Sequence, residues 1–93
     1  MILPILVDSN PGAERLQQLN PHSWEQQRFE AGPRECHYPV TTLIYILAGS
    51  ATITSEDGAP LSLEQGTLLR IPSESFCLWE VPASVTFHLQ ERR

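Results

Sequence analysis

The chain has 93 residues and a formal net charge of −5. It contains six arginines and no lysine. This length fits one domain over residues 1–93, with a thin stability margin that contacts with a partner would improve. The missing lysines exclude Schiff-base chemistry through a lysine amine. The acidic balance, without a basic stripe, argues against a nucleic-acid partner.

The first 23 residues predict a strand followed by one short helix. The opening MILPILV is apolar but too short to span a membrane, and it lacks the basic flank of a signal peptide. We therefore expect a buried first strand and no membrane partner. Asn10 can cap a helix and Pro11 suits its first turn, and the helix must end at Asn20 because Pro21 follows.

Residues 24–90 predict a barrel. Short runs of β-branched and apolar residues alternate with turn signals, of which Glu56-Asp57-Gly58 is the strongest. We expect strands over residues 24–29, 42–47, 50–55, 61–63, 67–71, 76–81 and 85–89. Seven or eight short strands with closely spaced turns are typical of an antiparallel sandwich or barrel, so the predicted fold class is all-β.

The stretch YILAGSATITSEDGAPLSLEQGTLLRIP, residues 45–72, resembles the core of a cupin, the RmlC-like jelly-roll barrel. It is most similar to the short single-domain cupins related to ethanolamine utilisation and to ureidoglycine aminohydrolase. Gly49, Asp57-Gly58, Gly66 and Pro72 form the framework of this resemblance. It implies a small antiparallel jelly roll, but one such fold hosts many unrelated functions.

Cupin metal sites use two motifs, G-x5-H-x-H-x3,4-E-x6-G and G-x5-P-x-G-x2-H-x3-N. With the four-residue spacing, the first motif places Glu35, His37 and Thr42 at its two histidines and its glutamate. The second places Glu74 at a glycine and Cys77 at its histidine. The resemblance thus implies a degenerate metal site with Glu35, His37 and Cys77 as candidate ligands. These groups suit zinc, so we expect no cofactor or a weakly bound divalent metal ion, most readily zinc.

The candidate ligand-binding residues in the barrel are His37, Thr42, Cys77, Trp79 and His88. Cys77 and Trp79 share one face of their strand. Cys77 is then a small core residue, a ligand contact or a nucleophile, and Trp79 is core or a stacking platform. A nucleophile needs a nearby base, and His37 or His88 could supply one only if the fold brings it close to Cys77. His88 faces away from the apolar residues of its own strand, and the sequence leaves open which face is the lumen.

The only cysteines are Cys36 and Cys77. Without a secretion signal, they indicate a cytoplasmic protein with free thiols. If Glu35 and His37 face the lumen, the alternation of a strand turns Cys36 outward while Cys77 points inward. We therefore expect no disulfide between the two cysteines.

Three functions are compatible with these residues. The first is a small cupin with a degenerate metal site, which binds a small polar metabolite in its barrel without robust metal-dependent catalysis. The second is a metal-dependent enzyme acting on a polar metabolite or a sugar, in which the metal polarises a substrate oxygen. The third is a protein-interaction module. Independently of these, the outward apolar residues Phe76 and Leu78 predict a homodimer.

Overall fold

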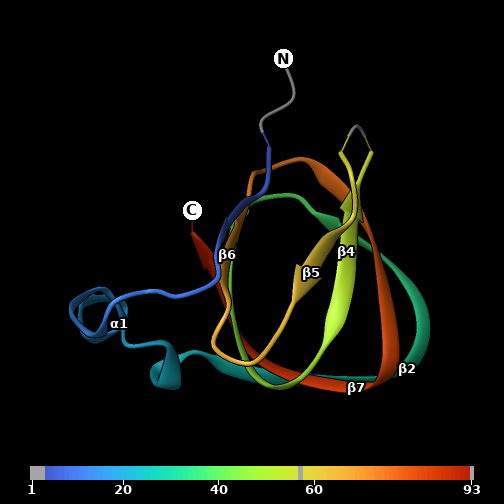
Figure 1. Ribbon diagram of the computed structural model, residues 1–93. Coiled ribbons are helices and arrows are strands. Elements are labelled where there is room, and N and C mark those ends of the chain that lie inside the picture. Colours follow the sequence, from blue (N-terminus) through green and yellow to red (C-terminus); the bar gives the residue numbers. More distant parts are fainter. Residues whose placement is uncertain (1–3, 57, 93) are drawn as a thin grey trace.

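The fold is organised by two long strands, β2 (Glu25–Tyr38) and β7 (Ser75–Arg92). They pair with each other and run through both halves of one curled sheet (Figure 1). The computed structural model describes residues 4–56 and 58–92. The shorter elements are β1 (Leu6–Asp8), α1 (Ala13–Leu19), the 3-10 helix η1 (Pro21–Ser23), β3 (Thr41–Gly49), β4 (Ala51–Ser55), β5 (Leu61–Leu63) and β6 (Leu68–Ile71).

The described strands form a seven-stranded sheet in the order β1-β6-β3-β7-β4-β5, with β2 paired to β7. The C-terminal part of β7 lies between β3 and the first part of β2, and its N-terminal part lies between β4 and the second part of β2. The register of β2 on β7 shifts between Glu30 and Gly32, and such an irregularity bends a strand. All of these ladders are antiparallel, which confirms the expected all-β jelly roll with one short helix.

Helix α1 begins later than its sequence suggested. Its N-cap is Gly12, which makes no side-chain capping hydrogen bond, so the prediction of Asn10 as the cap is wrong. The end of the helix is confirmed, because Asn20 leaves it in the left-handed conformation, with φ 48° and Pro21 next in the chain. None of the α1 residues is buried, and Figure 1 shows the helix to one side of the sheet.

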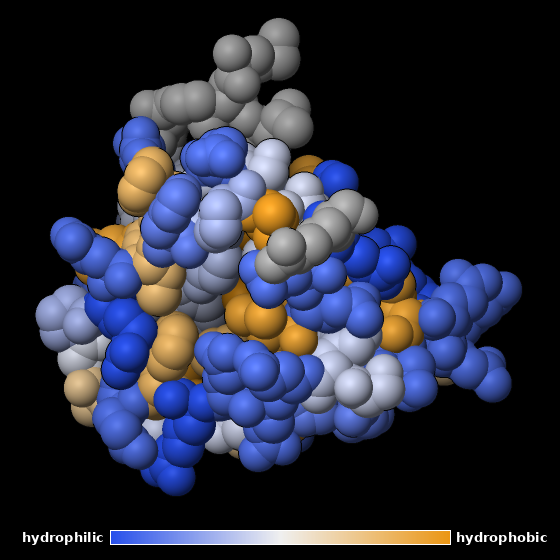
Figure 2. All heavy atoms as spheres, turned by 180° about the vertical axis from the view of Figure 1, so that it is seen from behind, coloured by the Kyte–Doolittle hydropathy of each residue, from blue (hydrophilic) through white to orange (hydrophobic). Residues whose placement is uncertain are grey.

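The first strand is less buried than expected. β1 pairs only with β6 at one end of the sheet order, and Leu6 is 54% exposed while the preceding Ile5 is buried. Residues 1–3 of the predicted strand lie outside the described residues. Within the described part of the chain, no helix has the length and apolarity needed to cross a membrane. The face shown in Figure 2 carries its hydrophobic side chains as separate groups among hydrophilic ones.

The apolar side chains form one large core inside the curl of the sheet and a smaller one on its outer side. The aromatic part of the inner core consists of Phe29, Trp79 and Phe87, and their rings lie about 5 Å apart, with centroid separations of 4.9–5.3 Å. The outer cluster surrounds Trp24, and Leu19 of α1 packs against it. The lumen of the jelly roll is therefore filled by side chains in its middle, which leaves its ends for a binding site.

The turn before β7 holds a residue in an unfavourable conformation. Glu74 has φ 60°, in the left-handed region that a residue with a Cβ adopts at a cost, and it stands where the second cupin motif has glycine. Its carboxylate lies 3.8 Å from Nε2 of His37, but the two side chains are 77% and 43% exposed, so the contact contributes little.

We expect Glu74→Gly to stabilise the fold by about 0.5 kcal/mol, because relief of the left-handed strain outweighs the greater entropy that glycine has in the unfolded chain. Urea denaturation followed by circular dichroism measures the change. Glu74→Gln is the matched control, since it removes the charge but keeps the Cβ, and it should leave the stability unchanged. A loss of stability in the glycine variant contradicts the strain at this turn.

Candidate functional site

The side chains of residues 35–38 point opposite to the expected directions. Cys36 lies directly across from Cys77 in the β2–β7 ladder, so the two side chains share a face, and both contact the inner core. Tyr38 is buried on that face, whereas Glu35 and His37 are exposed. The prediction that Glu35 and His37 face the lumen, with Cys36 outward, is therefore wrong.

The register shift in β2 explains this reversal. Phe29 lies in the inner core, and strict alternation from it would place residues 31, 33, 35 and 37 on the same inner face. Between Glu30 and Gly32 the alternation breaks, so that Cys36 and Tyr38 take the inner positions beyond the bend. With the alternative three-residue spacing of the first cupin motif, the inward motif positions become Cys36, Tyr38 and Thr42.

The inward side chains do not fit a divalent metal. Together with Cys77, the motif positions offer two thiols, one phenol and one alcohol, and this set lacks the imidazole and carboxylate ligands of the family motif. Among residues 4–56 and 58–92, no three His, Cys, Asp or Glu side chains lie together as a metal site. Glu35, His37 and Cys77 all line one hollow along β2 and β7, but Glu35 and His37 are exposed and Cys77 is buried in the core, so the three predicted zinc ligands do not form a metal site.

Trp79 and Tyr38 form a polar contact within the core. The Trp79 side chain has no exposed surface, and its Nε1–H donates a hydrogen bond of 2.9 Å to the Tyr38 hydroxyl oxygen. Its ring also stacks on Phe87, with the centroids 5.3 Å apart. Burial is the main cause that raises the pKa of Tyr38 far above its ordinary value, so this phenol stays neutral. Of the two roles considered for Trp79, this packing favours the core role.

The Cys77 thiol is a poor nucleophile in this position. Burial, with a smaller contribution from Cys36, raises the pKa of Cys77 to about 11, so the thiol is protonated at neutral pH. Neither proposed base is available to it. His37 lies on the opposite face of the sheet, and His88 lies outside the inner core.

His88 binds the N-terminal segment on the outer side of the sheet. Its Nδ1–H donates a hydrogen bond of 2.6 Å to the carbonyl oxygen of Pro21, and its Nε2 lies 3.3 Å from Oε1 of Gln26. The ring of His22 packs edge-on against it, with centroids 5.6 Å apart. The sequence left open which face of the His88 strand lines the lumen. In the structure the core residues Val85 and Phe87 face the lumen, and His88 does not.

A cavity of about 390 Å³ opens at the mouth of the barrel, where β2 starts and ends, β3 starts and β7 ends. Its polar lining includes Gln27, whose amide Nε2–H donates a hydrogen bond of 2.6 Å to Glu25 Oε2. The residues lining this mouth cavity are Glu25, Gln27, Phe29, Cys36, His37, Tyr38, Pro39, Thr42, Leu89 and Glu91. It therefore brings together two of the predicted binding residues, His37 and Thr42, but not Cys77, Trp79 or His88.

Sequence reasoning missed Glu25, Gln27 and Glu91 at this mouth. On β2, Glu25 pairs with Leu89 of β7 and Gln27 pairs with Phe87 of β7, so both lie on the face that carries Phe29 further along β2. Glu91 of β7 pairs with Thr42 of β3 and lies on the same face. The signal that could have located them is the two-residue spacing that places them on the same strand face as Phe29 and Phe87. This spacing becomes useful only once the inner face of these strands is known.

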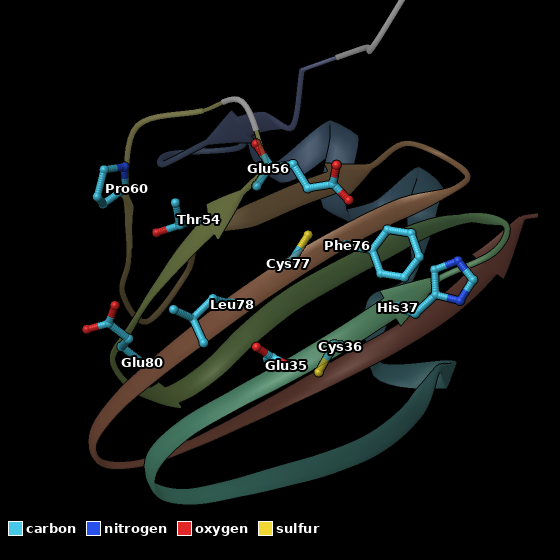
Figure 3. A pocket seen from close by; sticks show the side chains of 11 residues that line it. Glu35, Cys36, His37, Thr54, Glu56, Pro60, Phe76, Cys77, Leu78 and Glu80 are labelled. Atoms are coloured by element: carbon cyan, nitrogen blue, oxygen red, sulfur yellow. The ribbon is translucent and has the colours of Figure 1, made fainter.

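A second hollow, the outer groove, has a volume of about 800 Å³ and lies along the strands β2, β7 and β4 (Figure 3). His37 stacks on Phe76 here, with centroids 4.3 Å apart and an interplanar angle of 12°. Phe76 is 53% exposed and Leu78 is partly exposed. The residues lining the groove are Glu35, Cys36, His37, Thr54, Ser55, Glu56, Pro60, Phe76, Cys77, Leu78 and Glu80.

The curled antiparallel jelly roll, with motif residues gathered at one mouth, defines a cupin. More narrowly, the chain belongs to the family of the EutQ-like cupin domain, whose pattern matches residues 16–87. A comparison with curated protein sequences finds no match.

Solved structures agree with this assignment. A DUF861 family protein from Thermotoga maritima is 27% identical, with a TM-score of 0.89, and the alignment covers 96% of this chain and 100% of that one. An ethanolamine utilisation protein Q from Salmonella typhimurium is 19% identical, with a TM-score of 0.62, over 69% of this chain and 51% of that one. The epimerase RmlC from Legionella pneumophila is 15% identical, with a TM-score of 0.54, over 88% of this chain and 57% of that one. The last two similarities show the fold alone.

Proposed function

We propose that this cupin binds a small polar molecule in the mouth cavity. The observation that carries the proposal is the position of this cavity, because its wall contains Cys36, Tyr38 and Thr42, the inward positions of the first cupin motif. A concave site with an apolar floor and a few polar groups is the usual makeup of a small-molecule site, and Phe29 and Leu89 supply apolar lining here.

The polar lining favours ligands that donate hydrogen bonds. Glu25 and Glu91 bring two carboxylates to the mouth, and Gln27 and Thr42 add an amide and a hydroxyl, while no lysine or arginine lines the cavity among the described residues. Ionised carboxylates only accept hydrogen bonds, so they select hydroxyl or amine groups and disfavour anions. We propose a polyol, sugar or small amine as the ligand class.

The test is a screen of small polyols, sugars and amines by ligand-observed NMR, followed by affinity measurement for each binder. Glu25→Gln should weaken binding about tenfold, because a carboxylate that accepts a hydrogen bond from the ligand's hydroxyl or amine group is replaced by an amide. Glu35→Gln is the matched control, because Glu35 lines the outer groove and not the mouth cavity, and it should leave the affinity unchanged. A screen without binders, or binding that responds only to Glu35→Gln, overturns the proposal.

We also propose a homodimer formed through the outer groove, supported by the exposed ring of Phe76 next to Leu78. Light scattering at micromolar concentration should give twice the mass of the chain. Phe76→Ser should yield a monomer, whereas Leu6→Ser, at a residue with nearly the same exposure (54% against 53%), should not. A monomeric unmodified protein contradicts this assembly.

The proposed location is the cytosol. Its support is that Cys36 and Cys77 are both free thiols in the structure, as is usual in a reducing compartment. Fractionation of cells that produce this protein tests the location, and recovery of the chain in a secreted fraction contradicts it.

A further inference from the structure

Cys36 and Cys77 are cross-strand neighbours, and neither the fold nor the proposed ligand site uses both of them. They lie opposite each other in the β2–β7 ladder, and both are free. The earlier reason for expecting no disulfide was that the two side chains point to opposite faces of the sheet. That reason no longer holds, because both contact the inner core.

The backbone geometry of such a pair suits a disulfide. Directly opposed residues on antiparallel strands have Cβ atoms about 4.5–5.5 Å apart. Disulfides form with Cβ atoms roughly 3.5–4.5 Å apart and Cα atoms about 4.4–6.8 Å apart, so a small adjustment is sufficient. In Figure 3 the two sulfur atoms point away from each other, which means that rotation about Cα–Cβ must precede bond formation.

The two thiols differ in access. Cys36 is partly exposed and lines both the mouth cavity and the outer groove, whereas Cys77 is 4% exposed and lines the outer groove but not the mouth cavity. A small oxidant therefore reaches Cys36 first. Cys77 is then held beside it as the resolving thiol, as in redox-sensing pairs that combine an accessible and a second cysteine.

We propose that Cys36 and Cys77 form a redox-active thiol pair that closes to an intramolecular disulfide when hydrogen peroxide oxidises Cys36. The Cys36 thiol loses its proton, and the thiolate attacks one oxygen of hydrogen peroxide. An S–O bond forms, the O–O bond breaks, and the departing hydroxide takes up the proton and leaves as water. The Cys77 sulfur, although a poor nucleophile towards molecules in solution, then attacks the sulfenic sulfur of Cys36, because the ladder holds the two residues directly opposite each other. The S–S bond forms, the S–O bond breaks, and the Cys77 proton departs with the oxygen as a second water.

The overall reaction consumes two thiols and one hydrogen peroxide and yields one disulfide and two waters. The disulfide would join β2 to β7 beside Tyr38, at the wall of the mouth cavity. A dithiol reductant reverses the reaction by thiol–disulfide exchange. The pair is therefore a reversible modification site within the barrel wall, and it does not depend on which ligand the mouth cavity binds.

The test treats the folded, reduced protein with hydrogen peroxide, alkylates it in denaturant, and measures intact mass without reductant. We expect a monomer that has lost two hydrogens and takes up no alkylating reagent, with full recovery of two alkylatable thiols after dithiothreitol. The disulfide should also raise the urea midpoint, because it constrains the unfolded chain.

The single variants identify the roles of the two thiols. Cys77→Ser should retain a sulfenic acid on Cys36 that dimedone traps, whereas Cys36→Ser should react more slowly, because its remaining thiol is buried. Circular dichroism verifies folding, and Cys77→Ala replaces Cys77→Ser if the hydroxyl prevents folding. Two free thiols after peroxide treatment, or disulfides found only between chains, overturn the proposal.

Discussion

Gly49→Ala is expected to destabilise the protein by roughly 3–5 kcal/mol, which is enough to unfold much of a chain of this size. Gly49 has φ 82°, a conformation that alanine adopts only at a cost. A Cβ at this position also collides with the backbone carbonyl of Ser84 and lies 3.0 Å from Cα of Val85. These are backbone atoms of the neighbouring strand β7, so they cannot move aside without shifting the sheet.

The matched control for this prediction is Gly66→Ala. Gly66 has φ 90°, but a Cβ there meets no atom within 4 Å, so this variant carries the backbone strain without the collision. We expect it to cost about 1–2 kcal/mol. Chemical denaturation measures both variants, and equal losses at the two glycines would contradict the close approach of the strands at Gly49.

The same glycines explain why the fold could be predicted from the sequence. Gly49 and Gly66 both have positive φ, and a turn of this kind selects glycine by local sterics alone. A framework of such turns between β-branched runs fixes the number and approximate position of the strands. An antiparallel sandwich or barrel followed from that framework because each of its signals is local, and the resemblance to cupins narrowed the prediction to a jelly roll.

Side-chain direction along β2 was not predictable in the same way. The four-residue motif spacing suggested Glu35 and His37 as the inward residues, and the three-residue spacing gives Cys36 and Tyr38. The choice between them depends on the register shift after Glu30, which is a property of the pairing with β7. Because one irregularity reverses every later side chain of the strand, a small error exchanged the whole set of candidate ligands.

The acidic residues of the mouth cavity were missed for a related reason. Glu25 and Glu91 belong to the two ends of the barrel sequence, and only the β2–β7 and β3–β7 pairings bring them to the same mouth. By contrast, Thr42 lies on the inner face of β3 and lines the mouth cavity, and its motif position could be counted within a single strand from Gly49. What could be predicted was the local part of the site.

Trp79→Ala is expected to cost about 4 kcal/mol, the usual range for removing a large aromatic residue from a core. The side chain is fully buried, stacks on Phe87 and meets Phe29 edge-on at 5.2 Å. Its removal leaves a cavity in the middle of the barrel and deprives the Tyr38 hydroxyl of its donor. Urea denaturation followed by far-ultraviolet circular dichroism measures the change, and a loss below about 1 kcal/mol would place Trp79 outside the core.

The hydrogen bond between Trp79 and Tyr38 can be separated from the packing by two smaller changes. Trp79→Phe keeps an aromatic ring but removes the donor, and Tyr38→Phe removes the acceptor while keeping the ring. Tyr38→Phe should cost about 1–3 kcal/mol, because it leaves the buried indole N–H without a partner. Since the double variant has no unpaired donor or acceptor at this contact, its loss should fall below the sum of the single losses by about 1 kcal/mol. Strictly additive losses would show that this hydrogen bond contributes nothing to the stability of the barrel.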